Sequence, residues 1–263
     1  MLFELWLGLK AEFRKIKHAS IFRVTFIAFS LAPLMGGVFM IILKNPDLAA
    51  QSGALNAKAQ LMSISANWDS FRGILTQAMG VGGVLIFGFV ASWIFGREYS
   101  DGTAKDLLAL PISRTKILNA KFIVYTGWCL ALAISNLLIG LLIGALLQLP
   151  DFDNPIFFET LAVYAVTTLL TILLGPPIAF FALWGRGYLA PLGFVALTLV
   201  FSQVIAATGF GNYFPWSIPG LYSGAGGEYR DLLNVWSYFV LIATSLAGYF
   251  ATILWWKHAD QAK

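Results

Sequence analysis

Six apolar blocks of about 20 residues divide the chain, and short polar stretches separate them. A hydrocarbon core about 30 Å thick needs about 20 apolar residues for each helix that crosses it. Within the blocks the only Asp, Glu, Lys, Arg or His is Arg23, at the edge of the first. We therefore predict an all-α, polytopic membrane protein that forms one domain over residues 1–263. Its six transmembrane helices are expected at residues 21–43, 78–96, 122–148, 160–184, 188–208 and 235–256.

Composition agrees with a membrane location. Hydrophobic residues make up 59% of the chain and charged residues 11%, whereas an average soluble domain has roughly 25% charged residues. The first block is not expected to be a cleaved secretory signal, because charge continues to Arg23 and the apolar run is full length. The single cysteine, Cys129, allows neither an intrachain disulfide nor a multi-cysteine metal site.

Lys and Arg residues set the expected orientation. With the N-terminus inside, 13 of the 17 Lys and Arg residues fall on the inner side, and only Lys44, Lys58, Arg72 and Arg230 fall outside. An excess of Lys and Arg in cytoplasmic loops is the usual rule. We therefore predict a membrane protein with both termini in the cytoplasm. The net charge of +4 then reflects topology and not nucleic-acid binding.

An amphipathic segment, residues 1–19, precedes the first span. Its apolar residues recur at steps of three and four, at Leu2, Leu5, Leu9, Phe13 and Ile16. Lys10, Arg14 and Lys17 fall on another face. Such a helix is expected to lie in the cytoplasmic interface of the bilayer, although ordinary positively charged flanking sequence would look similar.

The most informative inner segment, residues 96–121, joins the second and third spans. Asp101-Gly102 is a turn signal, and Thr103 followed by Asp106 resembles a capping box with Asp in place of Glu. A short helix is therefore expected from about Ala104, ended by Pro111. Ser113 is a suitable cap for the next helix.

This short helix would carry three leucines, Leu107, Leu108 and Leu110. A helix of about two turns is marginal alone, so its apolar face must dock on another surface. That surface is the membrane or neighbouring helices in one interpretation, and a groove of a soluble partner in the other.

The Gly-Pro-Pro sequence of the fourth span and two polar residues of other spans are candidates for a gate or a transport pathway. Gly175-Pro176-Pro177 interrupts the fourth span, where each proline frees a backbone carbonyl; this is either a hinge or a structural kink. Asn136 and Gln203 are neutral polar residues inside apolar blocks.

Residues 209–234 are rich in Gly, Pro and aromatic side chains and are expected to form short helices or re-entrant turns at the outer interface.

The run from Glu98 through Asp101-Gly102-Thr103 and Leu107-Leu108 to Pro111 and Ser113-Arg114 resembles the first cytoplasmic loop of the ABC-2 type permeases. These are six-helix membrane subunits of bacterial exporters. The chain looks most like their subfamily for export of, or immunity to, peptide antibiotics such as bacitracin and lantibiotics. The resemblance implies that the loop is a coupling helix seated in a cleft of an ATPase subunit. The coupling residues would be Glu98, Asp101, Gly102, Thr103, Leu107, Leu108, Leu110 and Arg114.

The expected partners are therefore a cytoplasmic ABC ATPase, a second permease copy in a homodimer or homologous heterodimer, and membrane lipid. No cofactor, metal or nucleic acid is expected. The chain has no Gly-Lys pair, so it lacks the usual phosphate-binding loop and is predicted not to be an enzyme itself. The cargo is expected to be a peptide antibiotic, a lipid or another amphipathic molecule. The alternatives are an ion-coupled secondary transporter, which ordinarily needs an intramembrane charge, and a non-transport membrane scaffold.

Overall fold

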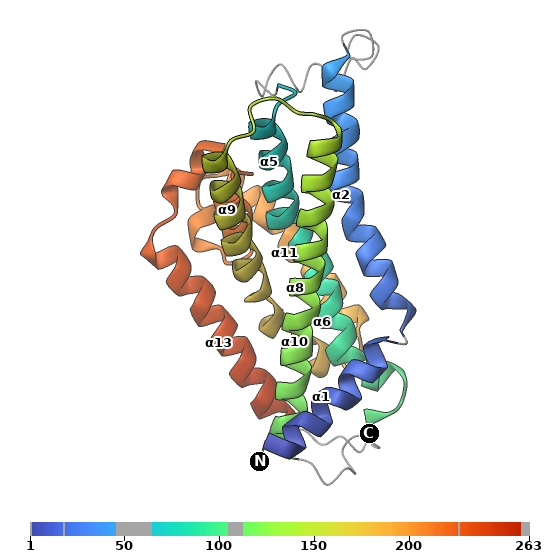
Figure 1. Ribbon diagram of the computed structural model, residues 1–263. Helices are drawn as coiled ribbons and strands as arrows, with labels where there is room; N and C mark the ends of the chain where they lie inside the picture. Colours follow the sequence, from blue (N-terminus) through green and yellow to red (C-terminus); the bar gives the residue numbers. More distant parts are fainter. Residues whose placement is uncertain (1, 18, 46–64, 105–112, 226, 259–263) are drawn as a thin grey trace.

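The computed structural model describes residues 2–17, 19–45, 65–104, 113–225 and 227–258, and these residues form helices and turns with no strand among them (Figure 1). Within them, six helical segments are long and apolar enough to cross a membrane. The predicted all-α fold with six transmembrane helices is thus confirmed. The six segments are α2 (Ser20–Lys44), Trp68–Ser100, α8 (Arg114–Leu146), Asn154–Trp184, α11 (Leu189–Ala207) and α13 (Val235–His258).

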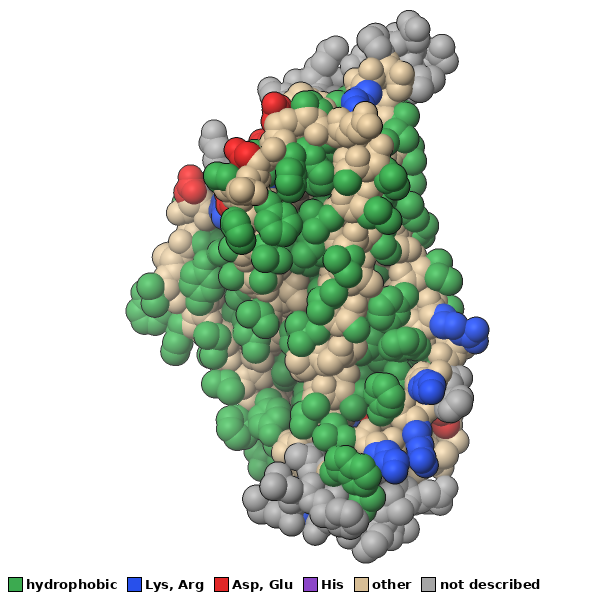
Figure 2. Space-filling view, in the orientation of Figure 1, with side chains coloured by type: hydrophobic (Ala, Val, Ile, Leu, Met, Phe, Trp, Pro, Cys, Tyr) green, Lys and Arg blue, Asp and Glu red, His purple; other side chains and the backbone are tan. Residues whose placement is uncertain are grey.

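Helix α1 (Leu2–Lys17) lies across one end of this bundle (Figure 1). We call this the α1 end; residues 101–104, the start of α8 and the last turn of α13 are also found there. The opposite end, where α5 begins, is called the α5 end. Figure 2 shows apolar side chains over the middle of the bundle, with Lys and Arg gathered near the α1 end.

The second span is longer than predicted and begins ten residues earlier, at Trp68 instead of residue 78. Polar residues hid its first turns, because Asp69 and Arg72 look like loop residues in the sequence. In the structure Arg72 bridges Asp69 at 2.7 Å and Glu159 at 2.9 Å. The span consists of α5 (Trp68–Gln77), the π-helix η1 (Ala78–Gly82) and α6 (Gly83–Ser100).

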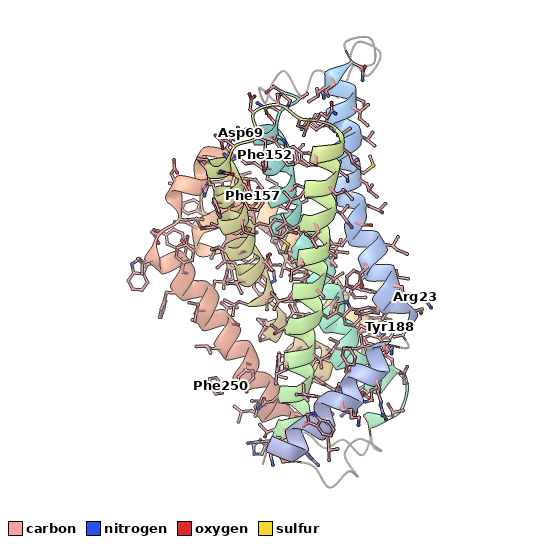
Figure 3. The ribbon with its side chains drawn as sticks, viewed as in Figure 1. Arg23, Asp69, Phe152, Phe157, Tyr188 and Phe250 are labelled. Carbon is pink, nitrogen blue, oxygen red and sulfur yellow. The ribbon has the colours of Figure 1, made fainter. Side chains whose placement is uncertain are left out.

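Aromatic side chains close the bundle at the α5 end. The ring of Trp68 lies 4.9 Å from that of Phe152, measured between centroids, and Phe152 in turn contacts Phe157 (Figure 3). The backbone N–H of Trp68 donates to Pro150 O at 3.1 Å. These contacts fix the start of α5 against the connection between α8 and α9.

The third span also begins earlier than its apolar block, because α8 starts at Arg114. Ser113 caps it as predicted: its side chain accepts a hydrogen bond from the backbone N–H of Lys116 at 3.4 Å. Because α8 begins at Arg114, its first two turns contain the basic residues Arg114, Lys116 and Lys121, and Lys121 is buried.

The fourth span is broken at the predicted Gly-Pro-Pro sequence, between α9 (Asn154–Ile172) and α10 (Gly175–Trp184). The Tyr125 hydroxyl of α8 donates to Ile172 O, one of the carbonyls that the prolines free, at 3.3 Å. Pro177 packs directly against Gly248 of α13, where any side chain would clash. A break that neighbouring helices satisfy and fill in this way is the arrangement expected of a structural kink.

Residues 209–234 form short helical turns: η2 (Gly211–Tyr213), α12 (Ile218–Tyr222) and η3 (Gly227–Leu232). Helix α12 is buried against the π-helix η1, and the two approach closely. A Cβ at Gly80 would lie 2.6 Å from Pro219 O. The Thr76 hydroxyl donates to Ser223 O at 3.1 Å. The segment thus packs into the bundle at the α5 end.

Candidate functional site

A buried ammonium group, that of Lys121, joins three helices at the α1 end of the bundle. Lys121 Nζ lies 3.3 Å from Glu12 Oε2 of α1 and 3.2 Å from Glu98 Oε1 of α6. It also donates to Ile94 O of α6 at 2.9 Å. An ammonium group has three donors, and this one uses all three. Only 2% of the Lys121 side chain is exposed.

Glu98 is the second centre of this network. Lys15 Nζ of α1 bridges Glu98 Oε1 and Glu12 Oε1, both at 2.9 Å. The other oxygen, Glu98 Oε2, accepts a hydrogen bond from the Thr103 hydroxyl at 2.7 Å. Glu98 therefore contacts α1, α8 and the start of the loop that follows its own helix. We call Glu12, Lys15, Glu98, Lys121 and Thr103 the ion network.

Local geometry brings these side chains together. Gly8, Glu12 and Ile16 recur every four residues, so they share one face of α1, and Glu12 and Ile16 are buried. Gly8 allows a close approach to α8, because a Cβ there would lie 3.3 Å from Ala120 Cβ. The face that packs on the bundle is therefore partly ionic.

The predicted apolar face of α1 is only partly buried. Ile16 is buried, but Phe13 is 63% exposed, and Trp6 is also exposed. Lys10, Arg14 and Lys17 are exposed, as expected. The bundle receives the charged Glu12 and Lys15, whereas Phe13 faces away from it, and the interfacial position of α1 stays a prediction.

Two carboxylates face two ammonium groups in the ion network, and a third cation, the Arg97 guanidinium, lies 3.6 Å from Glu98 Oε1. Burial alone would raise the pKa of Glu12, but Lys121 and Lys15 outweigh it and hold that pKa below its ordinary value. Burial likewise opposes the charge on Lys15, yet Glu12 and Glu98 raise its pKa. The contribution of Glu12 to the free energy of unfolding is therefore fully present at a pH above the ordinary pKa of a carboxyl group. It is lost as the pH falls through the lowered pKa of Glu12. Both groups stay charged at neutral pH.

The chain leaves α6 through a tight turn that the sequence predicted. Gly102 has a φ of +72°, a conformation that a β-branched residue rarely adopts. The backbone N–H of Thr103 donates to Glu98 O at 2.9 Å, and that of Asp101 donates to Arg97 O at 2.8 Å. Two bonds, one from the backbone and one from the side chain, therefore tie Thr103 to Glu98.

The remaining predicted coupling residues have different outcomes. Leu107, Leu108 and Leu110 lie outside the described residues, and so does most of the expected short helix. Arg114 contacts the chain itself, since its guanidinium donates to Trp256 O and Lys257 O, both at 3.2 Å. This cation lies at the C-terminal end of α13, where the helix dipole favours it.

Asn136, a predicted pathway residue, holds helices together. Its Nδ2 donates to Phe29 O of α2 at 2.7 Å, and its Oδ1 accepts from the Tyr164 hydroxyl of α9 at 3.0 Å. The residue is 1% exposed. Its amide therefore joins α2, α8 and α9 and is not directed at an open pathway within the single chain.

Gln203, the other predicted pathway residue, lies exposed on α11 beside a small cavity under α12. Trp216 and Ser217 also line this cavity, and the Trp216 indole N–H is buried without a hydrogen-bond partner among the described residues. The cavity holds about 40 Å³. That volume suits water but not a peptide or a lipid.

The sequence of this bundle matches a known family. The model of the family described as ABC-2 family transporter protein matches residues 8–204, which include the ion network, the first four spans and most of α1 and of the fifth span. The chain belongs to this ABC-2 family. It is also similar to a bacitracin transport permease protein of Bacillus licheniformis, with 26% identity over 178 residues. That match covers 68% of this chain and 85% of the relative.

This ABC-2 protein is the membrane permease subunit of an ABC exporter, and it works with an ABC ATPase subunit. The residues that join its helices were only partly visible in the sequence. Glu98 was singled out, but no contact was predicted for Glu12, Lys15 or Lys121. One signal could have found them: Glu98 and Lys121 are opposite charges that border adjacent spans, and Glu12 stands within a basic helix.

We expect Lys121→Met to lower the free energy of unfolding by about 3–5 kcal/mol, because it leaves two buried carboxylates with one ammonium group between them. The double variant Lys121→Met/Glu12→Gln should recover part of this loss. Denaturant unfolding of the detergent-solubilised permease measures both.

Arg72→Met is the matched control, because it removes ion pairs whose carboxylate side chains are 59% and 54% exposed. Its effect should be about 0–1 kcal/mol. The single variant Glu12→Gln completes the comparison. If the loss of stability in Lys121→Met/Glu12→Gln equals the sum of the losses in Lys121→Met and Glu12→Gln, Lys121 and Glu12 do not interact in solution.

Proposed function

We propose that the ion network transmits the motion of the partner ATPase into the bundle of this permease. The observation that carries this proposal is the position of Glu98, which contacts the loop through Thr103 and contacts two other helices through Lys15 and Lys121. Residues 105–112 would form the coupling helix seated in a cleft of the ATPase. Glu98, Asp101, Gly102, Thr103, Leu107, Leu108, Leu110 and Arg114 remain the proposed coupling residues.

The energy of the network explains why a small loop could move a bundle. Removing one member of a buried ion pair costs about 3–5 kcal/mol, so α1, α6 and α8 are expected to move together and not past one another. When ATP binding closes the ATPase, displacement of Thr103 pulls on Glu98. Alternating access would follow from a joint tilt of the three helices.

The proposed orientation puts the α1 end in the cytoplasm of a bacterial cell, with both termini there. Eleven of the 14 described Lys and Arg residues lie at the α1 end, in agreement with the rule for cytoplasmic loops. An ATPase in the cytoplasm could then reach residues 101–113 directly.

Single cysteines at Lys257 and Asp231 test this orientation, since both residues are exposed and they flank α13. The background is Cys129→Ala, which removes the only native thiol. A membrane-impermeant thiol reagent added to intact cells should label the cysteine at 231 and should reach that at 257 only after permeabilisation. The reverse result would invert the topology.

A second permease copy would complete the pathway. Helix α11 supports this, because it is the least buried of the six spans and exposes the Gln203 amide. A polar side chain facing hydrocarbon is unfavourable, and a second copy packed on this face would cover it. Gln203 would then line the pathway between the two copies.

The proposed cargo is an amphipathic peptide antibiotic of the bacitracin type. This proposal rests on the named function of the B. licheniformis relative and on the neutral, apolar character of the spans. Reconstituted with its ATPase, the permease should raise ATP hydrolysis when bacitracin is added. A hydrophilic peptide of similar size is the control. Stimulation by neither peptide would contradict this cargo class and leave the coupling proposal unaffected.

We expect three loop variants to retain membrane level but lose association with the ATPase. Gly102→Val conflicts with the positive φ, and Thr103→Ala removes the hydrogen bond to Glu98. Leu107→Asp places a charge on the predicted docking face. Affinity purification of the ATPase with each variant, together with transport-stimulated ATP hydrolysis, measures the effect.

Two matched variants serve as controls. Gly102→Asn should be tolerated better than Gly102→Val, because Asn adopts a positive φ more readily. Thr103→Ser keeps the hydroxyl and should restore association. If Gly102→Val, Thr103→Ala and Leu107→Asp all behave as the native chain, the loop is only a connector.

A further inference from the structure

An apolar groove of about 650 Å³ runs between α1, α2 and α8 at the α1 end. Leu9 and Phe13 of α1 form one wall, Phe22 of α2 another, and Val124, Gly127 and Trp128 of α8 its base. Its lining on α8 spans residues 123–131, which is about 12 Å of helix. Ile16, on the same face of α1 as Glu12, also lines the groove, but no residue of the ion network does, so the two sites are adjacent and separate.

The base of the groove is rigid. The Trp128 indole N–H donates to Thr25 Oγ1 at 3.2 Å, and its ring contacts Phe22 at 5.2 Å and Trp93 at 5.7 Å between centroids. A groove whose wall is fixed before binding loses little entropy on binding. It is therefore suited to hold a ligand rather than to collapse.

The apolar lining restricts the occupant. An extended peptide segment would place unpaired backbone amides against these side chains, which is unfavourable. A hydrocarbon chain has no such groups. Since the groove opens beside an interfacial helix, a lipid could insert one acyl chain along α8 and keep its headgroup at the level of α1.

The rim of the groove is positively charged. Lys10 lies in the lining, with its ammonium group 4.8 Å from the Trp6 ring centroid. Arg14, Lys17 and Arg23 are also exposed nearby, and Arg23 points away from the bundle in Figure 3. Within the described part of the chain, no salt bridge is recorded for any of these four side chains. Figure 2 shows this basic edge beside the apolar surface.

We propose that this groove binds an anionic phospholipid of the adjacent leaflet, with an acyl chain in the groove and the headgroup phosphate at Lys10. Charge complementarity selects the headgroup: an anionic lipid meets a rim of cations that form no salt bridge among the described residues, whereas a zwitterionic lipid brings its own cation with it. The site does not depend on the ATPase or on the cargo.

The test uses the purified permease with dioleoylphosphatidylglycerol and dioleoylphosphatidylcholine, which have identical acyl chains. Native mass spectrometry measures the retention of each lipid over a titration. Phosphatidylglycerol should be retained preferentially. Lys10→Gln should reduce that preference by about fivefold, the factor expected for one Lys near an anionic surface. Lys257→Gln, an exposed lysine on α13, is the control and should have no effect.

A second variant blocks the groove itself. Gly127 is exposed, and a Cβ there meets no atom within 4 Å, so Gly127→Leu fills the groove without disturbing the core. This change should remove retention of both lipids. Gly193→Leu is the matched control, because Gly193 of α11 is equally open and lies on another helix.

Three outcomes would overturn the proposal. Equal retention of the two lipids by the native chain would remove the headgroup selection. Wild-type retention by Gly127→Leu would show that the lipids bind elsewhere. Disulfide crosslinking between two copies through Gly127→Cys, in the Cys129→Ala background, would show that a second permease occupies the groove.

Discussion

The buried ammonium group of Lys121 is the interaction on which the α1 end of this permease depends. Its three donors reach two carboxylates and one carbonyl, on α1 and α6, from a position that is almost fully enclosed. A charge buried in this way is tolerated only while every partner is in place. The orientation of α1, the foot of α6 and the second turn of α8 are therefore set together, and the loop that begins at Thr103 is attached to all three.

The middle of the bundle is held by neutral groups. Asn136 links α2 to α9, and Tyr125 satisfies the backbone where the fourth span breaks. These hydrogen bonds need no change of charge and fix the helices at mid-height. The ion network lies at the α1 end, where an ATPase would act, and the Arg72 ion pairs lie at the α5 end. This arrangement is consistent with the proposal that the ATPase moves the helices at the α1 end while the hydrogen bonds of Asn136 and Tyr125 hold the middle of the bundle in place.

Helix α1 has two functions in this arrangement. One face carries Glu12 and Lys15 into the ion network, and another, with Phe13, forms a wall of the apolar groove. Lipid bound in the groove would press on the same helix that the coupling loop holds. The composition of the membrane could therefore influence how firmly α1 is seated, because both contacts act on one rigid element.

The sequence by itself determined the number of spans, the α1 helix, the turn at Gly102 and the cap at Ser113. Each of these depends on residues within one or two turns of each other, through periodicity, backbone conformation or a local hydrogen bond. The sequence missed the early start of the second span, because Arg72 needs Glu159, 87 residues away, to explain its place in a helix. The sequence also left open whether Asn136 lines a pathway, and that assignment stays a prediction.

Only the tertiary structure decided which charges meet. Lys121 lies 109 positions from Glu12 and 23 from Glu98 in the chain, and nothing local distinguishes it from the other lysines that flank the spans. Whether such a residue faces water or a buried carboxylate depends on how helices pack. That packing is the sum of many long-range contacts, which no short stretch of sequence contains.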